Sequence, residues 1–201
     1  MSSVGIVIAT FGDPKWRILA GRAELSAENQ TRQPENIILS HADTLQEARN
    51  YGADRCQTDH LIFLDADDEI EPGYVEAMLE GTGNIRRPST RGVYEDGSIE
   101  EPPSMIPRRD INESNCIVIG AMVDHDLFDQ AGGFGDYPLL EDWDLWLRCW
   151  NLGASVVDVP KAVYRIHVTP GSRNMAEPGL MSSVYAQIRR TSGGKRPWLS
   201  V

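Results

Sequence analysis

The residues best suited to do chemistry form one acidic run that contains Asp65, Asp67, Asp68, Glu69 and Glu71. The run follows the apolar stretch Leu61–Leu64, so it begins where a predicted strand ends. In an extended chain, residues i and i+2 project to the same side, so Asp65 and Asp67 can converge. Two adjacent carboxylates repel each other, and a hard divalent cation such as Mg²⁺ or Mn²⁺ relieves that repulsion. The alternative is that these acids charge the N-terminus of the next helix, where the helix dipole favours anions.

The elements before and after this run alternate between strands and helices. Val4–Ala9 is apolar on both of its alternating faces, which predicts a strand covered on both sides. Further strands are predicted at 36–39 and 61–64, and helices after Asp13, from Thr44 to about Arg55, and between Pro72 and Gly81. This alternation predicts an α/β fold with a parallel sheet and helices on both faces. In such sheets, ligands bind beyond the carboxyl ends of the strands, which is where Asp65 lies.

The second half of the chain is less regular. Residues 85–116 are rich in Arg, Pro, Ser and Glu, which predicts a loop or hairpin excursion. A strand is predicted at 116–119, and Trp143, Trp146, Leu147 and Trp150 form the apolar stripe of a helix. The last strands are predicted at 155–159 and 162–166, on either side of Pro160, followed by a helix over 179–190. We expect one domain over 1–190 and a mobile tail over 191–201.

Composition excludes several classes of protein. A length of 201 residues suits one domain. The formal net charge of −11 disfavours broad binding to phosphate backbones, although the arginines of the stretch 86–109 could meet an anionic acceptor or form a solvated loop. The three cysteines are far apart, which disfavours a disulfide framework and a cysteine-based zinc site. The sequence has neither a basic leader nor an apolar window of about 18 residues, so we expect a cytoplasmic protein without a membrane span.

Several motifs follow one another in a distinctive order. Ala48-Arg-Asn-Tyr-Gly-Ala53 precedes Leu61-Ile-Phe-Leu-Asp-Ala-Asp-Asp68, and Ala131-Gly-Gly-Phe134 precedes Leu140-Glu-Asp-Trp-Asp-Leu-Trp146 and Val163-Tyr-Arg-Ile-His167. From about Val4 to Arg173, this ordered set resembles the family 2 glycosyltransferases. The resemblance implies a GT-A fold, which is a Rossmann-like, mixed but mostly parallel sheet flanked by helices in a single domain. It also implies a nucleotide-sugar-binding half over 1–84 and an acceptor-binding half over 85–190.

On the donor side, the resemblance implies roles for residues at the ends of the first three strands. Thr10 and Phe11 would line the nucleoside pocket, and Asp43 would replace the acids that read the base in many relatives. Arg49 would face the base or the diphosphate, unless it is simply an arginine on the helix surface. The metal, Mn²⁺ or Mg²⁺, would be bound by Asp67 with Asp65, which also lies beside the ribose. The resemblance adds two further donor-side residues, which are His167 as another metal ligand or diphosphate contact and Arg173 on a loop that closes over the donor.

On the acceptor side, the resemblance implies that Asp142 is the general base and that Glu141 and Trp143 shape the acceptor site. A sugar hydroxyl is a poor nucleophile, so a carboxylate must take its proton in the transition state. Direct displacement with one base inverts the anomeric centre. Trp143 could stack on an acceptor ring. Taken without context, Asp142 would be a helix N-cap and His167 a paired histidine at a strand end.

The resemblance implies a metal-dependent inverting glycosyltransferase that uses a nucleotide-diphosphate sugar. UDP-sugar is the default donor, with GDP- or dTDP-sugar as alternatives. The acceptor is left open among a saccharide, a protein side chain, a lipid carrier and a hydroxylated base in nucleic acid. Two other functions compete, namely a sugar nucleotidyltransferase and a non-catalytic module that binds a nucleotide-sugar. The first-strand loop argues against the nucleotidyltransferase, because it lacks the glycine-rich basic segment that cradles phosphates.

Overall fold

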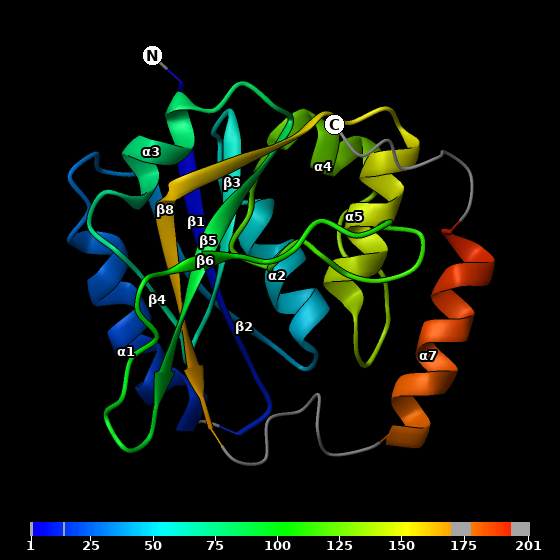
Figure 1. Ribbon diagram of the computed structural model, residues 1–201, viewed down its shortest axis with the longest axis horizontal. Helices are drawn as coiled ribbons and strands as arrows, with labels where there is room; N and C mark the ends of the chain where they lie inside the picture. The colour runs from blue at the N-terminus through cyan, green and yellow to red at the C-terminus, as the bar shows by residue number, and fades with distance from the viewer. Residues whose placement is uncertain (1, 14, 170–177, 194–201) are drawn as a thin grey trace.

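The computed structural model describes residues 2–13, 15–169 and 178–193, which contain a mixed sheet with helices on both faces (Figure 1). The strands are β1 (Val4–Phe11), β2 (Asn36–Ala42), β3 (His60–Asp65), β4 (Glu69–Ile70), β5 (Ile85–Tyr94), β6 (Ser104–Met105), β7 (Met122–Asp124) and β8 (Val156–Val168). The helices are α1 (Lys15–Glu28), α2 (Leu45–Ala53), α3 (Tyr74–Glu80), α4 (His125–Ala131), α5 (Glu141–Asn151) and α7 (Pro178–Thr191). The strand order is β2-β1-β3-β7-β5-β8-β4, with β6 paired to β5. None of the described helices is long and apolar enough to cross a bilayer.

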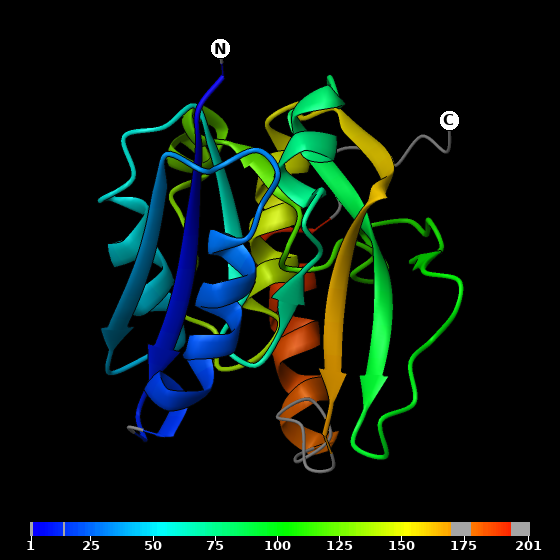
Figure 2. The same ribbon diagram turned by 90° about the vertical axis from the view of Figure 1, so that its left-hand side faces the viewer.

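The first half of the chain has the predicted strand–helix alternation. β1 pairs in parallel with β2 on one side and β3 on the other, and Ile6, Val7 and Ile8 are all fully buried. Successive side chains of a strand point to opposite faces, so β1 needs a helix layer on each face. Figure 2 shows α1 and α3 on one face and α2, α4 and α5 on the other. The predicted capping box at Thr44 and Glu47 is present and starts α2.

The second half differs from its prediction. The predicted loop at 85–116 begins with strand β5, which pairs in parallel with β8 along its whole length. β8 is one strand, not two, because it bulges around Pro160 while β5 continues. The predicted strand at 116–119 is irregular, and β7 starts only at Met122.

Ion pairs explain why this part of the sequence looks like a loop. The Arg87 guanidinium is buried and donates to Asp158 on β8 at 2.9 Å. Arg91 pairs with Glu71, and Arg108 also reaches Asp158. These arginines pair with acids from elsewhere in the fold, so they form neither a solvated loop nor an open basic groove.

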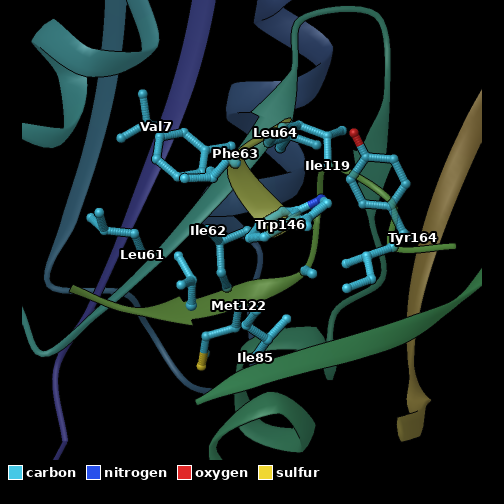
Figure 3. Packing of buried hydrophobic residues seen from close by; sticks show 14 of the residues in the cluster. Val7, Leu61, Ile62, Phe63, Leu64, Ile85, Ile119, Met122, Trp146 and Tyr164 are labelled. Carbon is cyan, nitrogen blue, oxygen red and sulfur yellow. The ribbon is translucent and has the colours of Figure 1, made fainter. Parts of the chain in front are cut away.

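The two halves share one hydrophobic core. Trp146 of α5 packs with Phe63 and Ile62 of β3, Met122 of β7 and Ile85 of β5 (Figure 3). Trp146 is fully buried, as the predicted apolar stripe of its helix requires. The packing therefore fixes α5 relative to the parallel strands.

The predicted tail at 191–201 is described only over 191–193, which are the last residue of α7 and the two residues that follow it. Thr191 is the last residue of α7, and Ser192 is buried. The Ser192 hydroxyl donates to Asp144 at 2.6 Å, and its carbonyl accepts from Asn151 at 2.6 Å. These buried polar groups of α5 need hydrogen-bond partners, which the end of α7 supplies. Residues 194–201 lie outside the described residues.

Two helical glycines offer a matched test of the packing between α2 and β1. A Cβ atom at Gly52 would lie 2.3 Å from Val7 Cγ1, whereas one at Gly21 in α1 would meet nothing within 4 Å. We expect Gly21→Ala to raise the free energy of unfolding by about 0.5–1 kcal/mol through helix propensity. We expect Gly52→Ala to lower it by about 1–3 kcal/mol through overpacking. Urea denaturation measures both, and equal stabilisation by the two substitutions would contradict this close approach.

Candidate functional site

Three carboxylates meet where β3 ends. β1, β2 and β3 are parallel and end at one edge of the sheet, at the bottom of Figure 2. Asp65 is the last residue of β3, and the chain then turns, with the Asp68 amide donating to the Asp65 carbonyl at 3.0 Å. One carboxylate oxygen from each of Asp65, Asp67 and Asp68 lies within 4.8 Å of the others. This turn therefore gathers three acids at the edge where ligands bind in such sheets.

The crowding shows in the acidities of these groups. Burial and the neighbouring Asp65 raise the pKa of Asp67, and the same causes together with Asp67 raise that of Asp68 well above its usual range. A divalent cation relieves such like-charge repulsion, and oxygen ligands suit Mg²⁺ or Mn²⁺. The sequence identified Asp65 and Asp67 but missed Asp68, because the i, i+2 argument assumed an extended chain. The consecutive acids Asp67 and Asp68 were the available signal for the turn.

His167 lies beside this cluster but belongs to a neighbouring pair. Its backbone amide donates to Asp68 Oδ1 at 2.8 Å, which ties β8 to the acidic turn. Its ring Nε2 lies 2.6 Å from Glu69 Oε2. The structure thus shows His167 as a histidine that is paired with Glu69 near the end of β8. Metal binding by His167 stays a prediction.

Arg49 of α2 connects the acidic turn to the start of α5. It is buried, and its two terminal nitrogens donate to Asp65 at 2.6 Å and to Glu141 at 2.7 Å. Its guanidinium also lies 5.0 Å from the centre of the Phe134 ring. Burial opposes the charge on Arg49, but the two carboxylates outweigh it and raise the pKa. Arg49 is therefore no helix-surface residue, and a contact with the nucleotide stays a prediction.

Asp142 stands in the first turn of α5, one residue after Glu141. Leu140 before it is the helix N-cap, so Asp142 is not. Leu140 has a left-handed backbone with φ of 59°, a strained conformation of the kind found at functional sites. Asp142 Oδ1 accepts from the Trp143 amide and Oδ2 from Asn115 Nδ2, both at 2.8 Å. Burial, and next the Glu141 charge, raise the pKa of Asp142 to about 6.

The two predicted acceptor residues beside Asp142 are both buried. Trp143 is buried, its Nε1 donates to the Ile111 carbonyl at 2.7 Å, and its ring stacks on Tyr185. The structure therefore corrects the prediction that Trp143 stacks on an acceptor, because it belongs to the buried stripe of α5. Glu141 is also buried and is held by Arg49.

The predicted nucleoside residues share the same sheet edge. Thr10 is buried, and its hydroxyl donates to the Ser40 carbonyl at 3.1 Å and contacts His41 Nδ1 at 3.0 Å. Phe11 ends β1 and is half-buried, and Asp43 follows the end of β2 and is exposed. Their contacts with a nucleoside stay predictions. Arg173 lies outside the described residues.

One cavity joins the acidic turn to Asp142. It has a volume of about 290 Å³, and its polar lining consists of Arg49, Asp65, Asp68, Asn115, Glu141 and Asp142. A larger hollow of about 550 Å³ lies at the opposite end of β3. There, Asp124 accepts from Asn84 at 2.8 Å and pairs with His60 at 3.0 Å, so its buried polar groups satisfy one another. The smaller cavity is therefore the candidate site, because its carboxylates are crowded rather than neutralised.

Comparison with known proteins gives one family match and several structural matches. Residues 23–113 match the model of glycosyl transferase family 2, a segment that includes α2 and the acidic turn. Comparison with curated proteins gives no match. Three solved structures of S. aureus TarS match 92% of this chain at 13% identity. TarS 1–349 with UDP-GlcNAc has a TM-score of 0.70, and TarS 1–349 with UDP has 0.67.

The structural likeness extends over only part of those proteins. The chain spans 65% and 64% of the two TarS 1–349 chains, and 39% of a longer TarS chain with a TM-score of 0.66. At this identity, the likeness shows a shared fold. The comparisons therefore show a match to glycosyl transferase family 2 over residues 23–113 and a fold shared with the TarS structures.

Proposed function

We propose that this chain transfers a sugar from a nucleotide-diphosphate donor to an acceptor hydroxyl, with inversion at the anomeric carbon. The observation that carries the proposal is one cavity whose lining includes both the crowded acids Asp65 and Asp68 and the carboxylate of Asp142. The TarS structures with UDP and UDP-GlcNAc support a UDP-sugar as the donor. The family match supports sugar transfer as the reaction.

The acidic turn is the donor side of the proposed site. Asp65, Asp67 and Asp68 would hold Mg²⁺ or Mn²⁺, and without a cation their charges repel a diphosphate. A divalent cation there supplies Lewis-acid stabilisation of the charge on the departing diphosphate. Arg49 fixes the orientation of Asp65, and the His167 amide fixes that of Asp68. The turn is therefore held in shape before any ligand binds.

Asp142 is the acceptor side. Its carboxylate takes the proton of the acceptor hydroxyl as the hydroxyl oxygen bonds to the anomeric carbon and the diphosphate leaves. Each carboxylate oxygen accepts one hydrogen bond from the protein, so each keeps a lone pair for the substrate. A pKa of about 6 leaves Asp142 ionised at neutral pH and makes it a stronger base than an exposed carboxylate.

Removing the base tests this role. We expect Asp142→Asn to retain UDP binding but to slow the release of UDP from UDP-GlcNAc, with water as the acceptor, by about 10²–10⁴-fold. Calorimetry measures the binding, and a coupled assay measures the UDP released. Asp136→Asn makes the same chemical change at an exposed residue of the preceding loop and should behave as the wild type. Full hydrolysis by Asp142→Asn would remove the base from this proposal.

Removing one acid tests the cation. We expect UDP with Mn²⁺ to raise the melting temperature of the wild type, and EDTA to abolish this shift, because ligands of the folded state stabilise it. Asp67→Asn should lose most of the shift and still fold, since its carboxylate is crowded by Asp65. Asp136→Asn should keep the full shift. An equal shift by UDP with Mn²⁺ and with EDTA would argue against a metal at this turn.

The acidity of Asp142 sets a pH dependence. Its pKa is raised from an ordinary value near 3.8 to about 6, and only the ionised form can accept a proton. We therefore expect kcat/KM to be level above pH 7 and to fall about tenfold per pH unit below pH 6. A profile of UDP release between pH 4.5 and 9 measures this limb. Activity that stays constant down to pH 4.5 would contradict the assignment.

A further inference from the structure

We propose that Asn115 is a positioning residue that fixes the Asp142 carboxylate as a proton acceptor in the cavity. The inference rests on the proposed function of Asp142 and adds a partner that the sequence motifs do not contain. Asn115 lies 27 residues before Asp142 and reaches it only through the fold. Both side chains line the 290 Å³ cavity.

The hydrogen bonds of Asn115 define which end of its amide faces Asp142. Its Oδ1 accepts from the Ile117 backbone amide at 3.1 Å. Its Nδ2 donates to Asp142 Oδ2 at 2.8 Å. Because the oxygen already accepts from the backbone, the NH₂ group must face the carboxylate. Asn115 thus offers Asp142 a hydrogen-bond donor that neither gains nor loses a proton at the pH of the reaction.

The segment that carries Asn115 is anchored to two helices, α5 and α7. The Ile111 carbonyl accepts from Trp143 Nε1, next to Asp142 in the chain. The Glu113 carbonyl accepts from the Tyr185 hydroxyl, and its carboxylate pairs with Arg189 at 2.9 Å. Tyr185 and Arg189 belong to α7, so this helix and α5 together hold the segment. A side chain on an anchored segment can fix the orientation of its partner.

The charged groups around Asp142 show why an uncharged hydrogen-bond donor such as Asn115 matters for its carboxylate. Glu141 on the same helix opposes the ionised form, and Arg49 from α2 favours it. Asp65 and Asp68 from the end of β3 also line the cavity. Asn115 favours the ionised form through its hydrogen bond. It does so without a second cation, which would hold the carboxylate in an ion pair and weaken it as a base.

Asn115→Asp tests the inference with little change in shape. The new side chain can still accept from the Ile117 amide, but it turns a second negative charge toward Asp142. We expect the acid limb of kcat/KM for UDP-GlcNAc hydrolysis to move up by at least about one pH unit, because two adjacent carboxylates retain one proton. Activity should therefore fall about tenfold at pH 6 and recover at pH 9. A ¹³C NMR titration of the Asp142 carboxyl, assigned from its absence in Asp142→Asn, should show the same upward move without any donor.

Asn112→Asp is the matched control. It places the same charge three residues earlier on the same segment, where Asn112 donates to Asp110 rather than to Asp142. We expect its pH profile and NMR titration to match those of the wild type. Asn115→Ala provides a second variant if Asn115→Asp folds poorly, and it should move the limb in the same direction by a smaller amount.

The outcomes separate this inference from the proposed function. Activity in Asp142→Asn would mean that the proposed base is wrong. Loss of activity in Asp142→Asn, together with wild-type titrations in both Asn115 variants, would overturn only the positioning role. A uniform loss of rate at every pH in the Asn115 variants would show a merely structural residue.

Discussion

The site depends on one buried arginine. Arg49 is 3% exposed and donates to Asp65 at the end of β3 and to Glu141 at the start of α5. Asp65 and Glu141 lie far apart in the sequence and belong to different halves of the fold. A buried carboxylate without a partner is strongly destabilising, so Glu141 requires Arg49 as much as Arg49 requires its acids. This interaction places the acidic turn and Asp142 on the walls of one cavity.

Arg49 neutralises too little charge to satisfy all the acids around it. The cavity is lined by Asp65, Asp68, Glu141 and Asp142, and Arg49 is the only basic residue in its lining among the residues that the structure describes. The protein holds this excess negative charge in place through packing and through backbone contacts such as the His167 amide on Asp68. Repulsion of this kind costs stability and is maintained where function uses it. Among Asp65, Asp67 and Asp68 this repulsion favours a cation, and beside Asp142 the Glu141 charge raises the basicity of the Asp142 carboxylate.

Local patterns made much of this predictable. The alternation of elements predicted the parallel strands and the position of Asp65, and the capping box at Thr44 predicted the start of α2. Composition gave the wrong secondary structure where oppositely charged residues that are far apart in the sequence form ion pairs. Arg87 reads as a loop residue, yet it is buried because Asp158 lies 71 residues away and directly opposite. Trp143 was expected to face a ligand, but its place in the stripe of α5 turns it inward.

Asn115 marks the limit of prediction from motifs. An isolated asparagine in an irregular, polar segment has no distinguishing neighbour in the sequence, and its partner lies on another element. The match to the family model also ends at residue 113, just before it. The other described residues that line the cavity are aliphatic, namely Ile106, Ile117, Val118, Ile119, Leu140 and Ile166. Such residues are common in any core, so they carry no chemical signature of an acceptor. The proposed donor side is therefore recognisable from its charged motif, whereas the proposed acceptor side is formed by packing and by one amide that only the fold brings into place.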